Sequence, residues 1–175
     1  MLTRLFDPTE GRITWDRIDL REFEPKDLRA HVGVIFQDFV RYDLTAYEKI
    51  ALGDVIHLND NLSVQQAAMR AGIHERIEML PHGYQTTLSR YFDEGSIGVD
   101  LSGGEWQKIA LARIFMRKDD LLILDEPTAA LDIQTEHELY SRLRELSNGH
   151  TSLFISHRFA TVSMVDKIAV FGVDK

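Results

Sequence analysis

The chain has 175 residues, 44% of them hydrophobic and 27% charged, which is enough for one globular domain with a buried core. Its formal net charge of −8 argues against a protein that grips nucleic acid by neutralising phosphates, so we expect no nucleic-acid partner. It contains no cysteine for a disulfide or a thiolate metal site, and no apolar run near the roughly 18 residues of a membrane helix.

The first thirty residues predict a helix end, a hairpin and a short helix. Residues Met1–Phe6 have the pattern of the last turns of a helix, and the following Asp-Pro pair would end it. Gly11–Trp15 and Ile18–Leu20 predict two short strands joined by a turn. Pro25–Ala30 fits a short helix with proline at its first position.

The next segment predicts a buried strand followed by a helical region. The run Val32–Phe36 is continuously apolar, which is typical of a strand covered on both faces, and Gln37 follows it. From about residue 39 to residue 99 the pattern is helical. Within it, Leu44–Ile50 predicts a helix start, and Ser63 predicts the N-cap of a helix that Gly72 ends.

The stretch Leu101–Glu105 predicts the start of an anion-binding helix. Ser102 and Glu105 have the S-x-x-E spacing of a capping box, and apolar residues then recur at helical spacing. Gly103 and Gly104 in the first turn would each cost the helix roughly 1 kcal/mol against alanine. Their presence makes sense if an anion must approach the free backbone N–H groups closely. The alternative is a flexible junction between a loop and a helix.

The stretch Leu121–Leu124 predicts a short buried strand that ends in two carboxylates. In open α/β sheets ligands gather at the carboxyl ends of the strands. An aspartate such as Asp125 can hold Mg²⁺ there, and a glutamate such as Glu126 can orient or deprotonate a water. The alternative for Asp125-Glu126-Pro127 alone is an acidic turn after a strand.

The C-terminal part predicts an amphipathic helix at Ile133–Leu146, a buried strand at Thr151–Ser156 and a last strand at Lys167–Phe171. Strands alternating with helices imply a parallel sheet with right-handed crossovers. Polar residues follow three of its strands: Gln37, then Asp125 with Glu126, then His157. We expect them to meet at one sheet edge, a combination that fits phosphoryl transfer to water.

The order and spacing of these motifs resemble those of ATP-binding cassette (ABC) ATPases over nearly the whole chain. Leu101–Glu105 looks like the signature motif and Leu121–Glu126 like the Walker B strand with its catalytic glutamate. Three further segments look like the Q-loop strand, the D-loop and the switch-histidine strand, respectively Val34–Gln37, Ala130–Asp132 and Ile155–His157. The segment Phe6–Gly11 resembles a segment of the nucleotide-binding domains of ABC exporters.

The resemblance implies an α/β fold: a P-loop-NTPase-like, mostly parallel sheet with a helical subdomain. It divides the chain into catalytic-core portions at 1–38 and 100–175 and a helical subdomain at 39–99. The ligands it implies are ATP and Mg²⁺, with Asp125 and Gln37 at the metal. The implied catalytic residues are Glu126, His157 and Gln37, and the implied contacts to ATP held by a second cassette are Ser102, Gly103 and Gly104, with Asp132 bridging the two sites.

One motif of the family does not occur in this sequence. There is no G-x-x-x-x-G-K-[ST], so the phosphate-cradling amides and the lysine of a P-loop are absent. We therefore expect the N-terminal part of the domain to be missing and the chain not to hydrolyse ATP unaided. We also expect apolar surface to be exposed at Val34, Ile123 and Ile155, and an isolated chain to be marginally stable or prone to aggregation.

The leading hypothesis is a portion of an ABC exporter ATPase. Its partners would be a second cassette, paired head to tail, and a transmembrane domain that holds it at the cytoplasmic face of the membrane. The alternative is a non-catalytic module whose signature segment completes the ATP site of a partner subunit. A DNA-repair or chromosome ATPase is disfavoured, because that class separates its motifs with long coiled coils and this sequence has no sustained heptads.

Overall fold

The computed structural model describes residues 1–36, 43–89, 98–117, 119–126, 139, 141–143, 151–156 and 165–170. The named elements, in chain order, are β1 (Thr14–Trp15), β2 (Ile18–Asp19), the 3-10 helix η1 (Leu20–Glu22), α1 (Pro25–Ala30), β3 (Val32–Ile35), β4 (Leu44–Thr45), α2 (Ala46–Ala51), α3 (Asn61–Ala71), α4 (His74–Glu78), η2 (Gly83–Gln85), β5 (Thr87–Leu88), α5 (Gly103–Phe115), β6 (Leu121–Asp125) and β7 (Thr151–Ile155).

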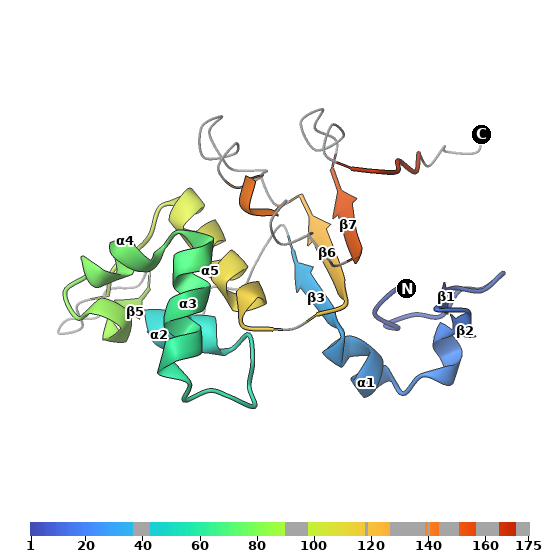
Figure 1. The fold of residues 1–175 in the computed structure, drawn as a ribbon, viewed down its shortest axis with the longest axis horizontal. Coiled ribbons are helices and arrows are strands. Elements are labelled where there is room, and N and C mark those ends of the chain that lie inside the picture. The colour runs from blue at the N-terminus through green and yellow to red at the C-terminus, as the bar shows by residue number, and fades with distance from the viewer. Residues whose placement is uncertain are drawn as a thin grey trace.

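A parallel three-stranded sheet forms one half of the molecule. Its order is β3-β6-β7, with Val34 opposite Ile123 and Ile123 opposite Leu153. The central strand β6 is flanked on both sides, which agrees with its apolar composition. The expectation of an α/β fold with a parallel sheet is therefore confirmed, and Figure 1 shows the sheet beside a separate helical lobe.

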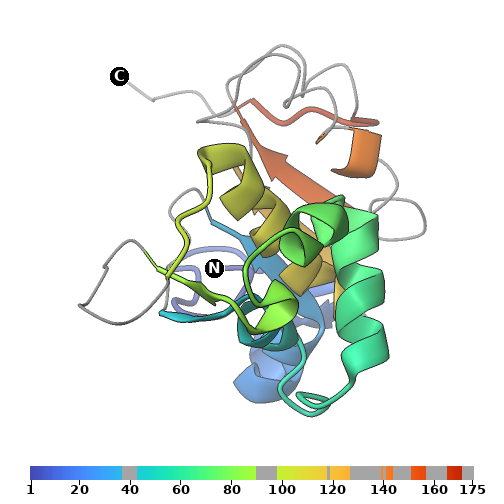
Figure 2. The ribbon, with the colours of Figure 1, turned by 90° about the vertical axis from the view of Figure 1, so that its left-hand side faces the viewer.

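The helical lobe consists of α2, α3, α4 and α5 with the short antiparallel pair β4–β5. Helix α5 packs against α3 and α2 on one side and reaches β3 on the other. It therefore lies between the lobe and the sheet, as Figure 2 shows from the helical side. One continuous buried cluster runs from Val64 of α3 through Leu111 of α5 to Leu124 of β6. Burial of this shared apolar surface holds the two halves together.

Local capping sets where the helices of the lobe begin. The side chain of Thr45 accepts a hydrogen bond from the Glu48 N–H, and Glu48 bonds back, so a capping box opens α2. At α3 the prediction was wrong: the N-cap is Asp60, and Ser63 lies in the first turn and donates its N–H to the Asp60 carboxylate. A carboxylate caps as well as a hydroxyl does, so the earlier of two suitable residues took the position. Gly72 ends α3 at φ 69°, as expected.

The N-terminal segment confirms the hairpin and the short helix but not the helix end. Residues 1–6 form turns and bends, and the positive φ of Arg4, 48°, does not fit a right-handed helix. The strands β1 and β2 pair as predicted, and Asp16 and Arg17 between them both have positive φ. Two successive left-handed residues give the tight turn whose twist matches that of the strands.

The C-terminal segment departs from the sequence-based expectation. Residues 165–170, which include Lys167, are not in a strand. Strand β7 forms where it was predicted, but it is not buried: Leu153 is 39% exposed and Ile155 47%. Exposed apolar surface was expected at Val34, Ile123 and Ile155. The expectation is confirmed for Ile155, but Val34 is only partly exposed and Ile123 is buried, with 8% of its surface exposed. The reason is position: Ile123 lies on the central strand, between Val34 and Leu153 on the same face of the sheet, whereas β7 is an outer strand of the described sheet.

None of the helices in the described part of the chain is both long enough and apolar enough to span a bilayer.

Candidate functional site

The carboxyl ends of the three parallel strands meet at one edge of the sheet. Ile35 of β3 lies opposite Leu124 of β6, and Asp125 lies opposite Ile155 of β7. Asp125 is thus the last residue of the central strand, and its side chain is partly buried. Any polar group placed just after these strands lies at the ligand-binding edge expected of an open α/β sheet.

Glu126 follows β6 with an unusual backbone. Its φ is +44°, and its N–H donates to the Ile155 carbonyl at 2.9 Å, so β6 and β7 are joined one residue beyond the strand. A left-handed conformation costs a residue with a Cβ about 1–2 kcal/mol. Strain of this kind is concentrated at functional sites. The sequence did not predict this left-handed conformation, because glycine and asparagine, and not glutamate, are the residues that usually indicate it.

Three of the predicted site residues lie outside the described part of the chain. They are Gln37, Asp132 and His157. Strand β3 ends two residues before Gln37, and β7 ends two residues before His157. The approach of these side chains to Asp125 and Glu126 remains a prediction.

The donor set at this edge suits a hard cation that keeps much of its water. Mg²⁺ takes one or two carboxylates, with waters and phosphate oxygens completing its shell. Asp125 supplies one partly buried carboxylate at the end of a rigid strand, which fits that requirement. Within the described residues, no three histidine, aspartate or glutamate side chains gather as a protein-only metal cage.

The second half of the predicted site is the N-terminus of α5. Ser102 caps the helix: its Oγ accepts the Glu105 N–H at 3.3 Å, and its own N–H donates to Glu105 Oε2 at 2.8 Å. The capping box predicted from the sequence is confirmed. Ser102 and Gly103 are exposed and Gly104 is partly exposed, so the first turn is open to a ligand. A helix N-terminus with exposed N–H groups favours anions.

A buried polar group that the sequence did not reveal lies behind this turn. Trp106 is 2% exposed, and its Nε1–H donates to Asp100 Oδ1 at 2.9 Å. Lys49 of α2 is only 1% exposed, and its Nζ lies 4.8 Å from the centre of the Trp106 ring. A cation on an indole face is a favourable contact when it is desolvated. Lysine side chains are usually exposed to solvent, so the sequence did not predict that Lys49 is buried.

Glu105 also binds outside its own helix. Arg76 of α4 donates through Nε to Glu105 Oε1 at 2.6 Å. Partial burial raises the pKa of Glu105, but the hydrogen bonds from Ser102 and Arg76 outweigh it, so the pKa lies below its ordinary value of 4.5. The Glu105 carboxylate is therefore ionised at neutral pH.

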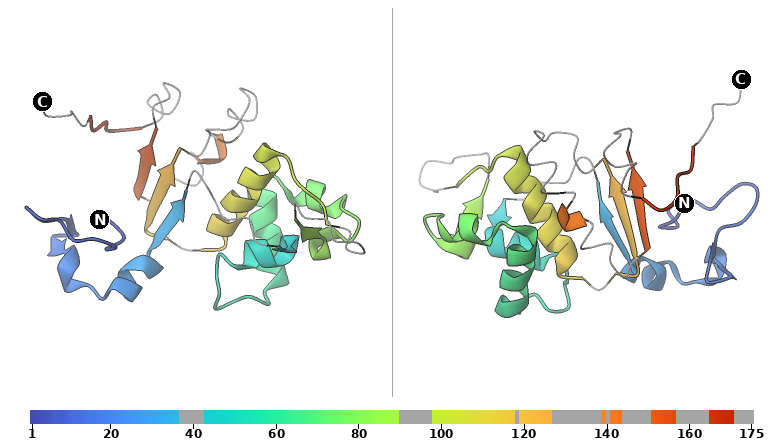
Figure 3. Two further views of the ribbon diagram at one scale, coloured as in Figure 1. Left: turned by 180° about the vertical axis from the view of Figure 1, so that it is seen from behind. Right: turned by 45° about the horizontal axis from the view of Figure 1, so that its top comes forward.

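The two halves of the site occupy the same end of the molecule but different lobes. Helix α5 runs away from its capped end, and β6 returns in the opposite direction. Figure 1 and both views of Figure 3 show the start of α5 and the end of β6 at one end of the ribbon, with α5 on the helical lobe. The described structure thus gives two separate halves, one acidic and one with exposed N–H groups.

Comparison with known proteins gives a consistent result. The chain is 39% identical over 170 residues to an ATP-dependent lipid A-core flippase of Alcanivorax borkumensis, covering 97% of this chain and 28% of that protein. It is 38% identical over 175 residues to the mitochondrial ABC transporter B family member 24 of Arabidopsis thaliana, covering 100% of this chain and 25% of that protein. It therefore spans about a quarter of the length of these relatives.

A solved structure has the same fold. It is described as a bacterial Atm1-family ABC exporter with ATP bound, and it matches with a TM-score of 0.79 and 37% identity over 94% of this chain and 27% of that chain. The family model for ABC transporters matches residues 1–129. This chain belongs to the ABC transporter family.

Proposed function

We propose that the chain is part of the ATP-binding and ATP-hydrolysing component of an ABC exporter. The observation that carries this proposal is the pairing of an acidic strand end, Asp125-Glu126, with an exposed, capped helix start at Ser102. The names of the relatives, an ATP-dependent flippase and an ABC exporter with ATP bound, support the same assignment.

The acidic half would act on the γ-phosphate end of ATP. Asp125, with Gln37, would hold Mg²⁺, which when bound neutralises charge on the phosphate oxygens. Glu126 would hold and deprotonate the attacking water, and Gln37 and His157 would contact the γ-phosphate or that water. The left-handed backbone of Glu126 fixes where its side chain leaves the strand.

The other half would serve a second cassette. Ser102, Gly103 and Gly104 lie on the helical lobe, apart from the acidic strand end, so they fit an ATP held by a partner paired head to tail. Asp132 would bridge the two sites. The sequence-based division, with catalytic-core portions at 1–38 and 100–175 and a helical subdomain at 39–99, is retained as a proposal; helix α5 belongs to the second core portion in this division but packs on the helical lobe. The unit would couple to a transmembrane domain at the cytoplasmic face of a membrane.

Glu126→Gln tests the proposal in the full-length natural protein that carries this chain. ATP turnover in membranes should fall by at least about a hundredfold, since general-base catalysis contributes that much, while ATP binding persists. Turnover that survives the substitution would contradict the role of Glu126. If the protein binds no ATP, yet Ser102→Arg abolishes turnover by a partner subunit, the chain is instead a binding module that completes the partner's site.

Two substitutions at one position separate capping from ATP contact. Ser102→Asp keeps a good N-cap and should leave the melting temperature within error, but its negative charge should raise the KM for ATP strongly. Ser102→Ala should cost about 1 kcal/mol of stability with a smaller rise in KM. Equal KM values for the two variants would remove Ser102 from the ATP site.

A further inference from the structure

Arg76 and Glu105 form an ion pair between two helices at the signature motif. Arg76 lies on α4 and Glu105 in the first turn of α5, with 2.6 Å between Nε and Oε1. The side chains are 40% and 26% exposed, so the pair is partly shielded from water. The other carboxylate oxygen, Oε2, accepts the Ser102 N–H. Glu105 is thus held by a cap on one side and by a cation on the other.

The position of Glu105 creates an electrostatic conflict in the proposed function. A carboxylate in the first turn stabilises an isolated helix, because it faces the positive end of the dipole. The same carboxylate opposes an incoming polyphosphate, because it repels the ligand and occupies the Ser102 N–H. Its depressed pKa keeps it charged at neutral pH. The first turn can receive ATP only if this charge is compensated nearby.

We propose that Arg76 compensates the charge of Glu105 and fixes its carboxylate in the cap, so that the phosphates of ATP can approach Ser102 and Gly103. This inference rests on the proposed function of Ser102. Arg76 is a positioning residue: it acts on ATP through Glu105 and the first turn of α5. Helix α4 thereby influences the affinity for ATP at Ser102 and Gly103, although no residue of α4 contacts the nucleotide.

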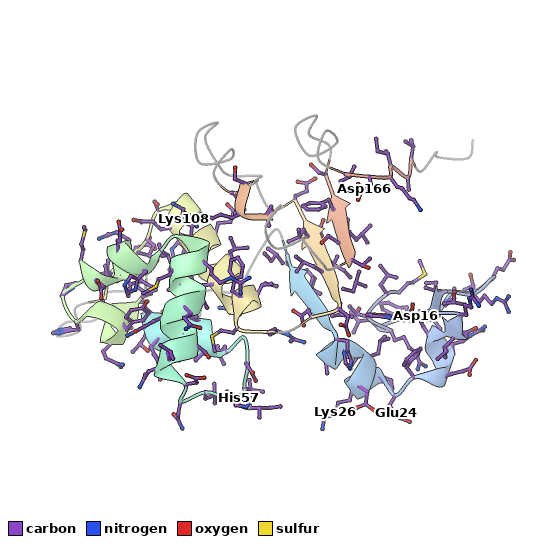
Figure 4. All side chains as sticks on the ribbon, in the orientation of Figure 1. Asp16, Glu24, Lys26, His57, Lys108 and Asp166 are labelled. Carbon is purple, nitrogen blue, oxygen red and sulfur yellow. The ribbon has the colours of Figure 1, made fainter. Side chains whose placement is uncertain are left out.

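The experiment uses the full-length natural protein and measures KM for ATP, kcat and melting temperature. Its variants are Arg76→Ala, Arg76→Lys, Glu105→Gln and the double variant Arg76→Ala with Glu105→Gln. Lys26→Ala is the matched control: it removes one positive charge from an exposed residue of α1, on the opposite side of the molecule from Lys108 of α5 in Figure 4. ATP turnover by the unsubstituted protein is measured first, because its absence overturns the proposed function itself.

Arg76→Ala should raise the KM for ATP by roughly fivefold to twentyfold with little change in kcat, because an uncompensated like charge opposes binding. The rise should shrink when ionic strength increases, since salt screens exposed charges. Adding Glu105→Gln should return KM to near the original value, and Arg76→Lys should preserve it. Lys26→Ala should change nothing.

Two results would overturn the inference while leaving the proposed function intact. The first is an unchanged KM in Arg76→Ala. The second is a raised KM that neither salt nor Glu105→Gln corrects, which would give Arg76 a packing role only. If Arg76→Ala lowers the melting temperature sharply, Arg76→Gln keeps the length and a donor, and the same tests of salt and of rescue by Glu105→Gln decide.

Discussion

At the scale of single residues, Glu126 combines a chemical role with a backbone that disfavours its side chain. Its φ of +44° is one that asparagine and glycine adopt readily and β-branched residues avoid. The Glu126 N–H is bonded to the Ile155 carbonyl, so the conformation is held from outside the residue. The strain arises from the backbone conformation at residue 126 and not from the carboxylate, so substitutions can separate the effect on stability from the effect on catalysis.

Replacing Glu126 by asparagine or by valine should therefore have different effects on stability. Both remove the carboxylate and should abolish ATP turnover. The free energy of unfolding of Glu126→Val should be about 1–2 kcal/mol lower than that of Glu126→Asn, because the branched Cβ of valine conflicts with a left-handed backbone. Chemical denaturation of the two variants measures the difference, with Glu126→Gln as the reference. Equal stabilities would mean that the backbone relaxes away from the left-handed region.

At the scale of elements, α5 is both a capped helix and the centre of the packing. Its N-cap Ser102 and its first residue Gly103 are exposed, and its buried face lies against α2 and α3. The Arg113 side chain donates to the Lys49 carbonyl at 3.0 Å, and Lys49 covers Trp106. The exposed turn is thus supported from behind by a fully packed layer, which holds its N–H groups in one direction.

The capping box of α5 predicts a dependence of stability on pH. The folded pKa of Glu105 lies below its ordinary value of 4.5, so the unfolded chain binds protons more readily as the solution is acidified. The contribution of Glu105 is therefore complete above about pH 4.5 and is lost as the pH falls through the lower, folded pKa. Melting curves of the unsubstituted protein and of Glu105→Gln should converge on acidification. A constant gap down to pH 3 would contradict this assignment.

Most elements, and part of the site, could be predicted from the sequence. The strand β6 and the capping box of α5 were predicted correctly, because the apolar run and the S-x-x-E spacing that indicate them involve only neighbouring residues. The cap of α3 was misplaced because Asp60 and Ser63 are both good caps, and only the course of the chain selects one. The burial of Lys49, the left-handed Glu126 and the Arg76–Glu105 pair depend on contacts between distant segments, which local patterns do not encode.

At the scale of the whole molecule, the sheet is covered unevenly. Partly buried Phe154 of β7 packs against the main core, whereas Leu153 and Ile155 point to the other face and are exposed. Among the described strands β7 pairs only with β6. A strand with a free edge and an apolar face is a site for association between chains.

The recombinant 175-residue chain should therefore aggregate through β7. Leu153→Lys with Ile155→Lys should reduce light scattering and raise the soluble fraction, because charges on an edge strand oppose pairing. The control is Val55→Lys with Ile56→Lys, which changes charge equally at residues that are 64% and 83% exposed in the loop before α3. Equal improvement in both double variants would assign the effect to net charge. A monomeric unsubstituted chain with a cooperative, high-temperature melt would contradict the expectation that the chain aggregates.

The distribution of the buried core has a consequence for the order in which the protein loses structure. The first member of the shared cluster along the chain is Ile35, so the segment containing β1, β2 and α1 adds nothing to it. Within that segment, arginine side chains donate to backbone carbonyls, as in Arg4 to Phe23 and Arg29 to Thr3. From outside it, Arg117 donates to the carbonyls of Arg29 and Ala30. The amides of that segment should exchange with solvent through local opening, long before those of α5 and β6, which open only with the cooperative unit that they share.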